Sequence, residues 1–186
     1  MEYLIIQILS SLAMALVVVW FDRKLRDKKE LDSLIDSLIF ELTQNLRIAR
    51  TIKHTINNEL KTIRKGGWPP TPDPTFLDLA YSRATLSEAF FDFILKRRMS
   101  AFIKKLYDCY ASLQIVNYQT RNINEAKFDV LIRPSGLPKR IEEILQKRKE
   151  VIVKVIEPAI IELLLLSAQI EPKFQDMIKP FTTTQE

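Results

Sequence analysis

Residues 3–21, YLIIQILSSLAMALVVVWF, contain no charged side chain and only three polar interruptions, one Gln and two Ser. Nineteen helical residues rise about 28 Å, which is close to the thickness of the hydrocarbon core of a bilayer. Tyr3 and Trp20 lie near the two ends of the run, where membrane proteins concentrate aromatic side chains. We therefore expect residues 3–21 to form a transmembrane helix.

Two other interpretations of this run are a cleaved signal peptide and a buried core helix. Ala13 and Ala15 offer an A-x-A cleavage pattern. However, no cation precedes the run, and the apolar sequence continues through Val19 beyond that pattern. The transmembrane interpretation is the favoured one of the three.

The flanking charges predict the orientation of this helix. Five cations follow the run within nine residues, and these are Arg23, Lys24, Arg26, Lys28 and Lys29. Lys and Arg accumulate on the cytoplasmic side of membrane helices. The prediction is a single-pass protein of the cell membrane, with its N-terminus outside and its C-terminal domain in the cytoplasm.

The composition excludes several classes of protein. The chain has 186 residues, 28 Lys and Arg against 23 Asp and Glu, one His, one Cys and three Gly. A single Cys and a single His rule out a disulfide framework and zinc sites built from Cys and His. Three glycines leave no material for a phosphate-binding glycine-rich loop. We expect no metal and no cofactor, and the reduced Cys109 agrees with a cytosolic setting.

Residues 22–65 predict a continuation of the first helix, because this stretch lacks Gly and Pro. Apolar side chains recur at alternating steps of three and four from Leu31 to Ile63, with Asn45 and Glu59 filling two gaps. Further apolar residues, such as Leu34 and Leu46, make this face broader than a two-stranded coiled-coil seam. The pattern predicts one rod that packs in a bundle and ends at Gly66-Gly67.

After a proline-rich turn at 68–74, the spacing predicts a helix over 75–95 and a longer one over about 100–124. Residues 127–132 could be strand or helix, and Pro138 suits the first turn of a last helix that ends near residue 170. The fold class is therefore all-α: a transmembrane helix (3–21), a cytoplasmic antiparallel bundle of about four helices (22–171) and a loosely ordered tail (172–186).

The second half of the last helix is apolar on nearly all sides. Lys154, Glu157 and Glu162 argue against a second membrane span, because each charge at mid-bilayer costs about 2.5 to 3.5 kcal/mol. A central bundle helix is the simplest interpretation. A helix that its own chain does not cover would leave a patch for a partner. The candidate partner contacts are Ile161, Leu164 and Leu165, with Pro158 bending the helix.

No catalytic group of residues is evident, so we expect a protein that is not an enzyme. Pro72-Asp73 together with Glu125-Ala126-Lys127 imitates a nuclease pattern, but that chemistry needs both parts around one metal. Here one part lies in a turn and the other ends a helix some fifty residues later. We therefore expect no nuclease site here.

A cationic run without an acid lies between Asp92 and Asp108. It is a solvated face or a contact for anionic lipid or an acidic partner, and nucleic acid is less favoured. The candidate anionic-surface contacts, together with Arg23, Lys24 and Arg26, are Lys96, Arg97, Arg98, Lys104 and Lys105.

Asn45 lies on the apolar stripe of the first helix, and Asn117 lies near that of the third. A buried Asn specifies register when it finds a partner, so we expect Asn45 to bond another helix, with Asn117 as the leading candidate. Glu41, Leu42, Asn45 and Leu46, with Tyr110 and Asn117, resemble small uncharacterised prokaryotic single-span helical proteins over residues 1–125. The resemblance implies the architecture and no activity.

Two functions remain open. In the first, the bundle mediates protein–protein interaction or self-association at the cytoplasmic membrane face, with the bilayer and a protein partner or a second copy as its contacts. In the second, the protein is a membrane tether whose basic surfaces bind anionic lipid or nucleic acid. Steep salt dependence of binding would favour the second function.

Overall fold

The computed structural model describes residues 2–65, 72–97, 99–132, 138–170, 174–175 and 179, without the side chains of 2–13, 15, 126, 129–132, 138–140 and 170. The chain is helical throughout these elements, which confirms the predicted all-α class. The expected tail, 172–186, lies outside the described residues except at three positions, of which Phe174 is buried in the core.

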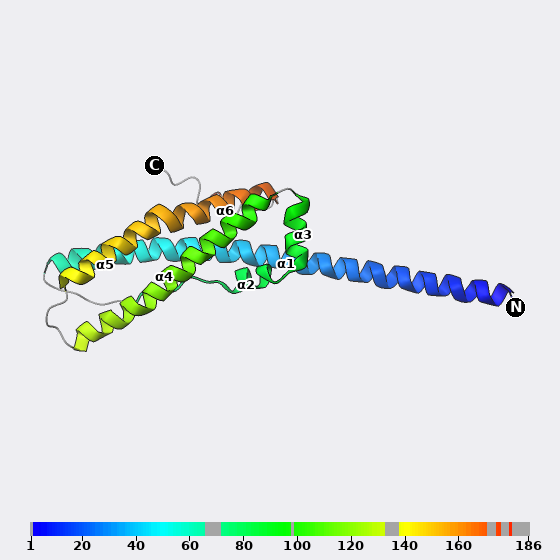
Figure 1. Cartoon of the computed structure of the whole chain (residues 1–186), viewed down its shortest axis with the longest axis horizontal. Helices are drawn as coiled ribbons and strands as arrows, with labels where there is room; N and C mark the ends of the chain where they lie inside the picture. The colour runs from blue at the N-terminus through cyan, green and yellow to red at the C-terminus, as the bar shows by residue number, and fades with distance from the viewer. Residues whose placement is uncertain are drawn as a thin grey trace.

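The first element, α1 (Glu2–Arg64), is one continuous helix of 63 residues. No Gly or Pro interrupts it, so nothing in the backbone chemistry breaks its hydrogen-bond ladder. Its N-terminal part projects alone from the bundle, and its C-terminal part lies along the other helices (Figure 1). The predicted continuation of residues 3–21 into the bundle as one rod is confirmed.

No helix formed by the described side chains is long and apolar enough to cross a membrane. The expected transmembrane helix is thus without support from the structure. Most of the predicted run, residues 3–13 and 15, lies outside the described side chains.

The prediction of one helix over 75–95 was wrong, because the structure has two. They are α2 (Leu79–Thr85) and α3 (Glu88–Lys96). Ser87 between them has an extended backbone, and its side chain accepts a hydrogen bond from the Phe90 N–H at 3.3 Å. This N-cap starts a new helix in a new direction, and α3 crosses α1 at a steep angle where α1 leaves the bundle (Figure 1).

One of the later helices is longer than expected, and the last rod begins and ends where predicted. Helix α4 (Ser100–Ile132) includes residues 127–132, which are therefore helical and not a strand. The last rod consists of α5 (Pro138–Val151), a π-helical turn η1 (Ile152–Ile156) and α6 (Glu157–Ile170). The π turn directly precedes Pro158, whose ring would collide with the carbonyl of Lys154 in a regular α-helix. The wider turn accommodates this ring.

The three long helical rods are not all antiparallel. Helices α1 and α4 run in the same direction, and the rod α5–α6 runs in the opposite direction (Figure 1). An extended segment, residues 72–78, and α2 return the chain along α1 before α4 begins. The predicted antiparallel bundle of about four helices is corrected to three long rods plus this return path.

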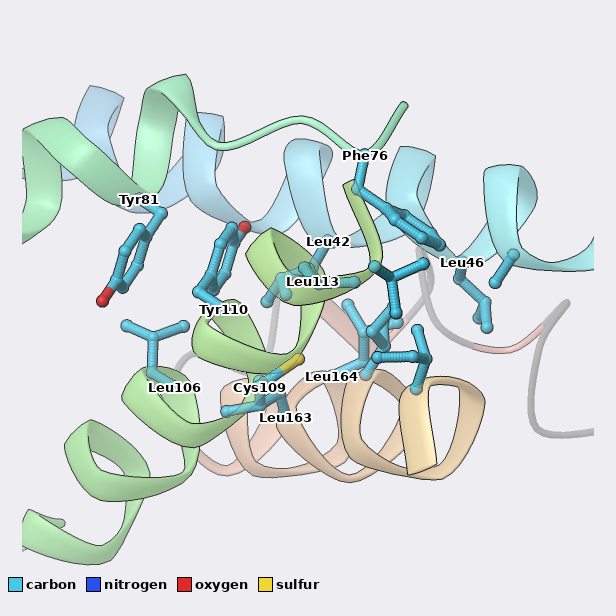
Figure 2. Packing of buried hydrophobic residues seen from close by; sticks show 14 of the residues in the cluster. Leu42, Leu46, Phe76, Tyr81, Leu106, Cys109, Tyr110, Leu113, Leu163 and Leu164 are labelled. Carbon is cyan, nitrogen blue, oxygen red and sulfur yellow. The ribbon is translucent and has the colours of Figure 1, made fainter. Parts of the chain in front are cut away.

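The core lies where α1, α4 and α6 converge (Figure 2). Leu42 and Leu46 of α1 meet Leu113 of α4 and Leu163 of α6, and all four are at most 1% exposed. Phe76 from the extended segment inserts into the same core at 3% exposure. The extended segment thus contributes Phe76 and Asp73 to the buried interior, while its other five residues are exposed.

Candidate functional site

The extended segment 72–78, here named the clasped segment, is held by asparagine side chains from both sides. Asn45 of α1 accepts a hydrogen bond from the Leu77 N–H at 2.7 Å and donates one to the Leu77 carbonyl at 2.8 Å. Asn117 of α4 makes the same pair with Phe76, at 2.7 and 2.9 Å. A carboxamide thus takes the place of a neighbouring β-strand.

The alternation of these bonds follows from the extended backbone. In such a backbone, successive residues direct their N–H and C=O groups to opposite sides. Phe76 therefore faces α4, and Leu77 faces α1. Asn124 of α4 makes the same pair of bonds with Asp73, at 3.0 and 3.3 Å, so the alternation holds for Phe76 and Leu77 but does not extend back to Asp73.

The prediction that Asn45 is buried is confirmed, because its side chain is fully enclosed. The prediction that it bonds Asn117 was wrong, since each amide bonds the clasped segment that lies between α1 and α4. Asn117 itself is only half-buried. Sequence periodicity placed both amides on inner faces but had no means of showing the chain segment between them.

Glu41 holds the chain at the point where the clasped segment ends and α2 begins. Its carboxylate accepts hydrogen bonds from the Ala80 N–H at 2.7 Å and the Tyr81 N–H at 3.2 Å. Asp78 makes no side-chain cap for α2, so Glu41 supplies the negative charge that a helix N-terminus favours. The Tyr110 hydroxyl donates to the same carboxylate at 2.7 Å.

Tyr110 and Tyr81 stack face to face beside this carboxylate, with ring centroids 4.1 Å apart (Figure 2). Burial, and next the hydrogen bond to Glu41, raise the pKa of Tyr110 well above its usual range. Tyr110 therefore remains a neutral donor. Of the residues that carried the resemblance noted from the sequence, Asn45 and Asn117 bond the clasped segment. Glu41 and Tyr110 meet at the start of α2, which follows that segment.

A buried group of four charges lies at the other end of the clasped segment. The Arg148 Nη1 atom is 2.9 Å from Asp73, and the Lys127 Nζ atom is 2.8 Å from Glu59 and 3.4 Å from Asp73. The Arg148 guanidinium also donates to the Thr120 hydroxyl at 2.6 Å. Each of the four charged side chains is at most 3% exposed. Burial lowers the pKa of Arg148, and the two carboxylates oppose that shift.

Two of the nuclease-like residues lie together, although they are far apart in the sequence. Asp73 and Lys127 meet in the charge cluster, whereas Glu125 is exposed to solvent. The cluster contains two carboxylates and two cations and is closed to solvent. Its side chains come from α1, α4, α5 and the clasped segment, so it joins these four elements. Among the described residues, no three His, Cys, Asp or Glu side chains form a metal-ligand group.

The candidate cationic contacts have different surroundings. Arg23, Lys24 and Arg26 are exposed on the projecting part of α1, with Lys24 over the Trp20 ring and Arg26 paired to Asp22. In the later run, Lys104 is exposed, whereas Lys105 pairs with Glu162.

The rest of that run is also partly engaged. Lys96 lies 3.9 Å from Asp92, and Arg97 stacks on the Phe93 ring at 4.3 Å. Arg98 lies outside the described residues. The run is therefore not a uniform cationic patch.

The candidate partner contacts on α6 separate in the structure. Leu164 is fully buried among α1 and α4 side chains, so its expected role at a partner contact was wrong. Its own chain covers it because α6 packs against both long helices. Leu165 is 46% exposed and Ile161 is half-buried.

Sequence reasoning missed a groove of about 1000 Å³ at the base of the projecting part of α1, here named the stalk groove. Its walls come from residues 27–41 of α1 and from 77–89, which include α2. Phe40, Leu77 and Leu79 are exposed on it at 56%, 44% and 65%. The available signal was a large apolar residue, Phe40, that lies outside the apolar stripe of the first helix.

Cys109 provides a test of the core. It is 2% exposed, and burial raises the pKa of its thiol from 9.0 to about 12. A folded-state pKa above the unfolded value contributes stability below pH 9 that is lost as the pH rises toward 12. We expect a thiol-reactive dye to label the folded protein very slowly at pH 7 to 9 and to label the denatured protein completely. Rapid labelling without denaturant would contradict the described packing.

Comparisons of this chain with family models, characterised proteins and solved structures returned no match. The molecule is therefore defined by its architecture, an all-α bundle on one long helix with an asparagine-held inner segment.

Proposed function

We propose that this chain is a membrane-anchored helical-bundle protein that binds another protein or a second copy of itself at the cytoplasmic membrane face and catalyses no reaction. The observation that carries the proposal is the continuity of α1. One helix connects the uncharged run at 3–21 with core residues such as Leu42 and Leu46. An anchor of this kind would hold the bundle at a constant height above the bilayer.

The stalk groove supports a binding role. Its base begins at Asp27, six residues beyond Phe21, which corresponds to about 9 Å along a helix. Exposed large apolar side chains grouped in a groove are typical of interaction sites. The groove lies within reach of other proteins at the same membrane.

The anchor and its orientation are tested by protease protection. We expect trypsin added outside right-side-out vesicles to leave residues 22–186 intact. In opened vesicles, trypsin should cut first at exposed cations on the projecting part of α1, such as Lys24 and Lys28. Digestion of the bundle from outside, or recovery of the protein in the soluble fraction, would contradict the proposal.

A second candidate function is a tether for anionic lipid headgroups. All residues from Asp22 to Glu30 are exposed, including five cations within this short stretch. Juxtamembrane Lys and Arg contribute about 1 kcal/mol each to binding of an anionic membrane surface. Binding that weakens steeply with salt would favour this candidate over an apolar protein contact.

A further inference from the structure

The stalk groove combines an apolar floor with charges of both signs. Asp27, Glu30, Asp36 and Glu41 supply the acids, and Lys29 and Arg83 supply the bases. Leu31 and Leu34 are half-buried along its floor. No other part of the described chain covers Phe40, which stands at the rim with more than half of its surface exposed.

We propose that this groove receives a second copy of the chain, in a parallel pair about a two-fold axis along α1. In this arrangement Phe40 of each copy packs between Leu77 and Leu79 of the other. The inference rests on the proposed function, because a shared membrane anchor holds two copies parallel and at the same height. An interface of this kind uses the same surface on both subunits and must therefore complement itself.

The charges of the groove meet that requirement. In a parallel two-fold pair, residues at equal heights lie near one another across the axis. Glu30 of one copy would then approach Lys29 of the other, which brings opposite charges together. Charge complementarity of this type selects partner and register.

The exposed face of α1 beside the groove permits close approach of a second helix. Ser33 and Ser37 lie one turn apart on this face, and both are exposed. The Ser37 hydroxyl already donates to the Ser33 carbonyl at 2.7 Å. Small side chains allow two helix backbones to come close together, and the satisfied hydroxyl lowers the cost of removing water.

Two other grooves of the described chain are less suited to a second copy. The groove between α4 and α5 carries Lys147, Arg148 and Lys154 with one acid, Glu150. The groove between α1 and α5 carries Lys61, Arg64, Lys149 and Lys154 with the same acid. Two such surfaces facing each other would bring like charges together, which opposes association.

Cysteine cross-linking in the membrane tests the pair. The native Cys109 is buried with a raised pKa, so an introduced thiol is the reactive one. We expect full-length Ser37→Cys protein in native membranes to form a disulfide-linked dimer under mild oxidation. Ala111→Cys, an exposed small residue on α4 outside the groove, is the matched control and should give several-fold less dimer.

Phe40→Lys in the Ser37→Cys background should weaken association about tenfold, because it removes apolar burial and adds a charge. The exposure of Phe40 means that helix content and melting temperature should stay unchanged. Equal dimer yields for Ser37→Cys and Ala111→Cys, or an unchanged yield with Phe40→Lys, would overturn the inference. Protease protection is independent of these yields, so a failed dimer leaves the anchored interaction protein standing.

Discussion

Asp73→Ala will lower the free energy of unfolding by about 3 to 5 kcal/mol, because it leaves buried cations without their shared carboxylate. Arg148 and Lys127 both lie within ion-pair distance of Asp73, and none of the three side chains is more than 3% exposed. Urea unfolding of the full-length protein in detergent, followed by helix circular dichroism, measures the change. Asp92→Ala removes an exposed carboxylate 3.9 Å from Lys96 and should change stability by less than about 0.5 kcal/mol.

The pairing within the charge cluster can be separated from loss of packing. Arg148→Met combined with Asp73→Ala removes one charge of each sign and leaves Glu59 with Lys127. A buried pair replaced by apolar groups often costs little, so the double variant should be more stable than Asp73→Ala alone. Destabilisation equal to the sum of the single variants would show that the charges act independently.

Asn45→Leu will destabilise the bundle by about 2 to 5 kcal/mol, because it leaves the N–H and C=O of Leu77 without partners. Both bonds are short, at 2.7 and 2.8 Å, and the Asn45 side chain is fully buried. Leu77 is held from the α1 side by this amide, so the change should also loosen the segment. Thermal melting and hydrogen exchange at residues 76–78 measure the two effects.

Asn58→Leu is the matched control for this prediction. Asn58 lies on the same helix, is exposed and bonds only the His54 ring among the contacts described for its side chain. Its replacement should leave the melting temperature unchanged and should change the free energy of unfolding by less than about 0.5 kcal/mol. A parent-like melt for Asn45→Leu would mean that the amide bonds do not hold the clasped segment.

These two sites show how far sequence reasoning reaches. The spacing of apolar residues predicted that Leu42, Leu46 and Asn45 share an inner face of α1, and all three are buried. It also predicted one uninterrupted helix to the residues before Gly66, and α1 ends at Arg64. Both follow from local chemistry: backbone propensity, the 3.6-residue period and the absence of Gly and Pro.

The pairings could not be predicted in the same way. Asp73 meets Arg148 from 75 positions later in the chain, and Glu59 meets Lys127 from 68 positions later. Periodicity states which face of a helix is inward but not which element lies opposite. Here the opposite element for Asn45 is the extended segment 72–78, which sequence patterns divided between a turn that ends at Pro74 and a helix that begins at Thr75.

The sequence alone determined the all-α class, the continuity of α1 and its inner face, because these depend on interactions within a few residues. The tertiary structure decided that α1 and α4 run in the same direction, that the clasped segment lies between them, and that Leu164 is covered while Phe40 is not. Those outcomes depend on how the return path fills the space between helices. Burial and hydrogen bonding there are settled only when distant segments pack together.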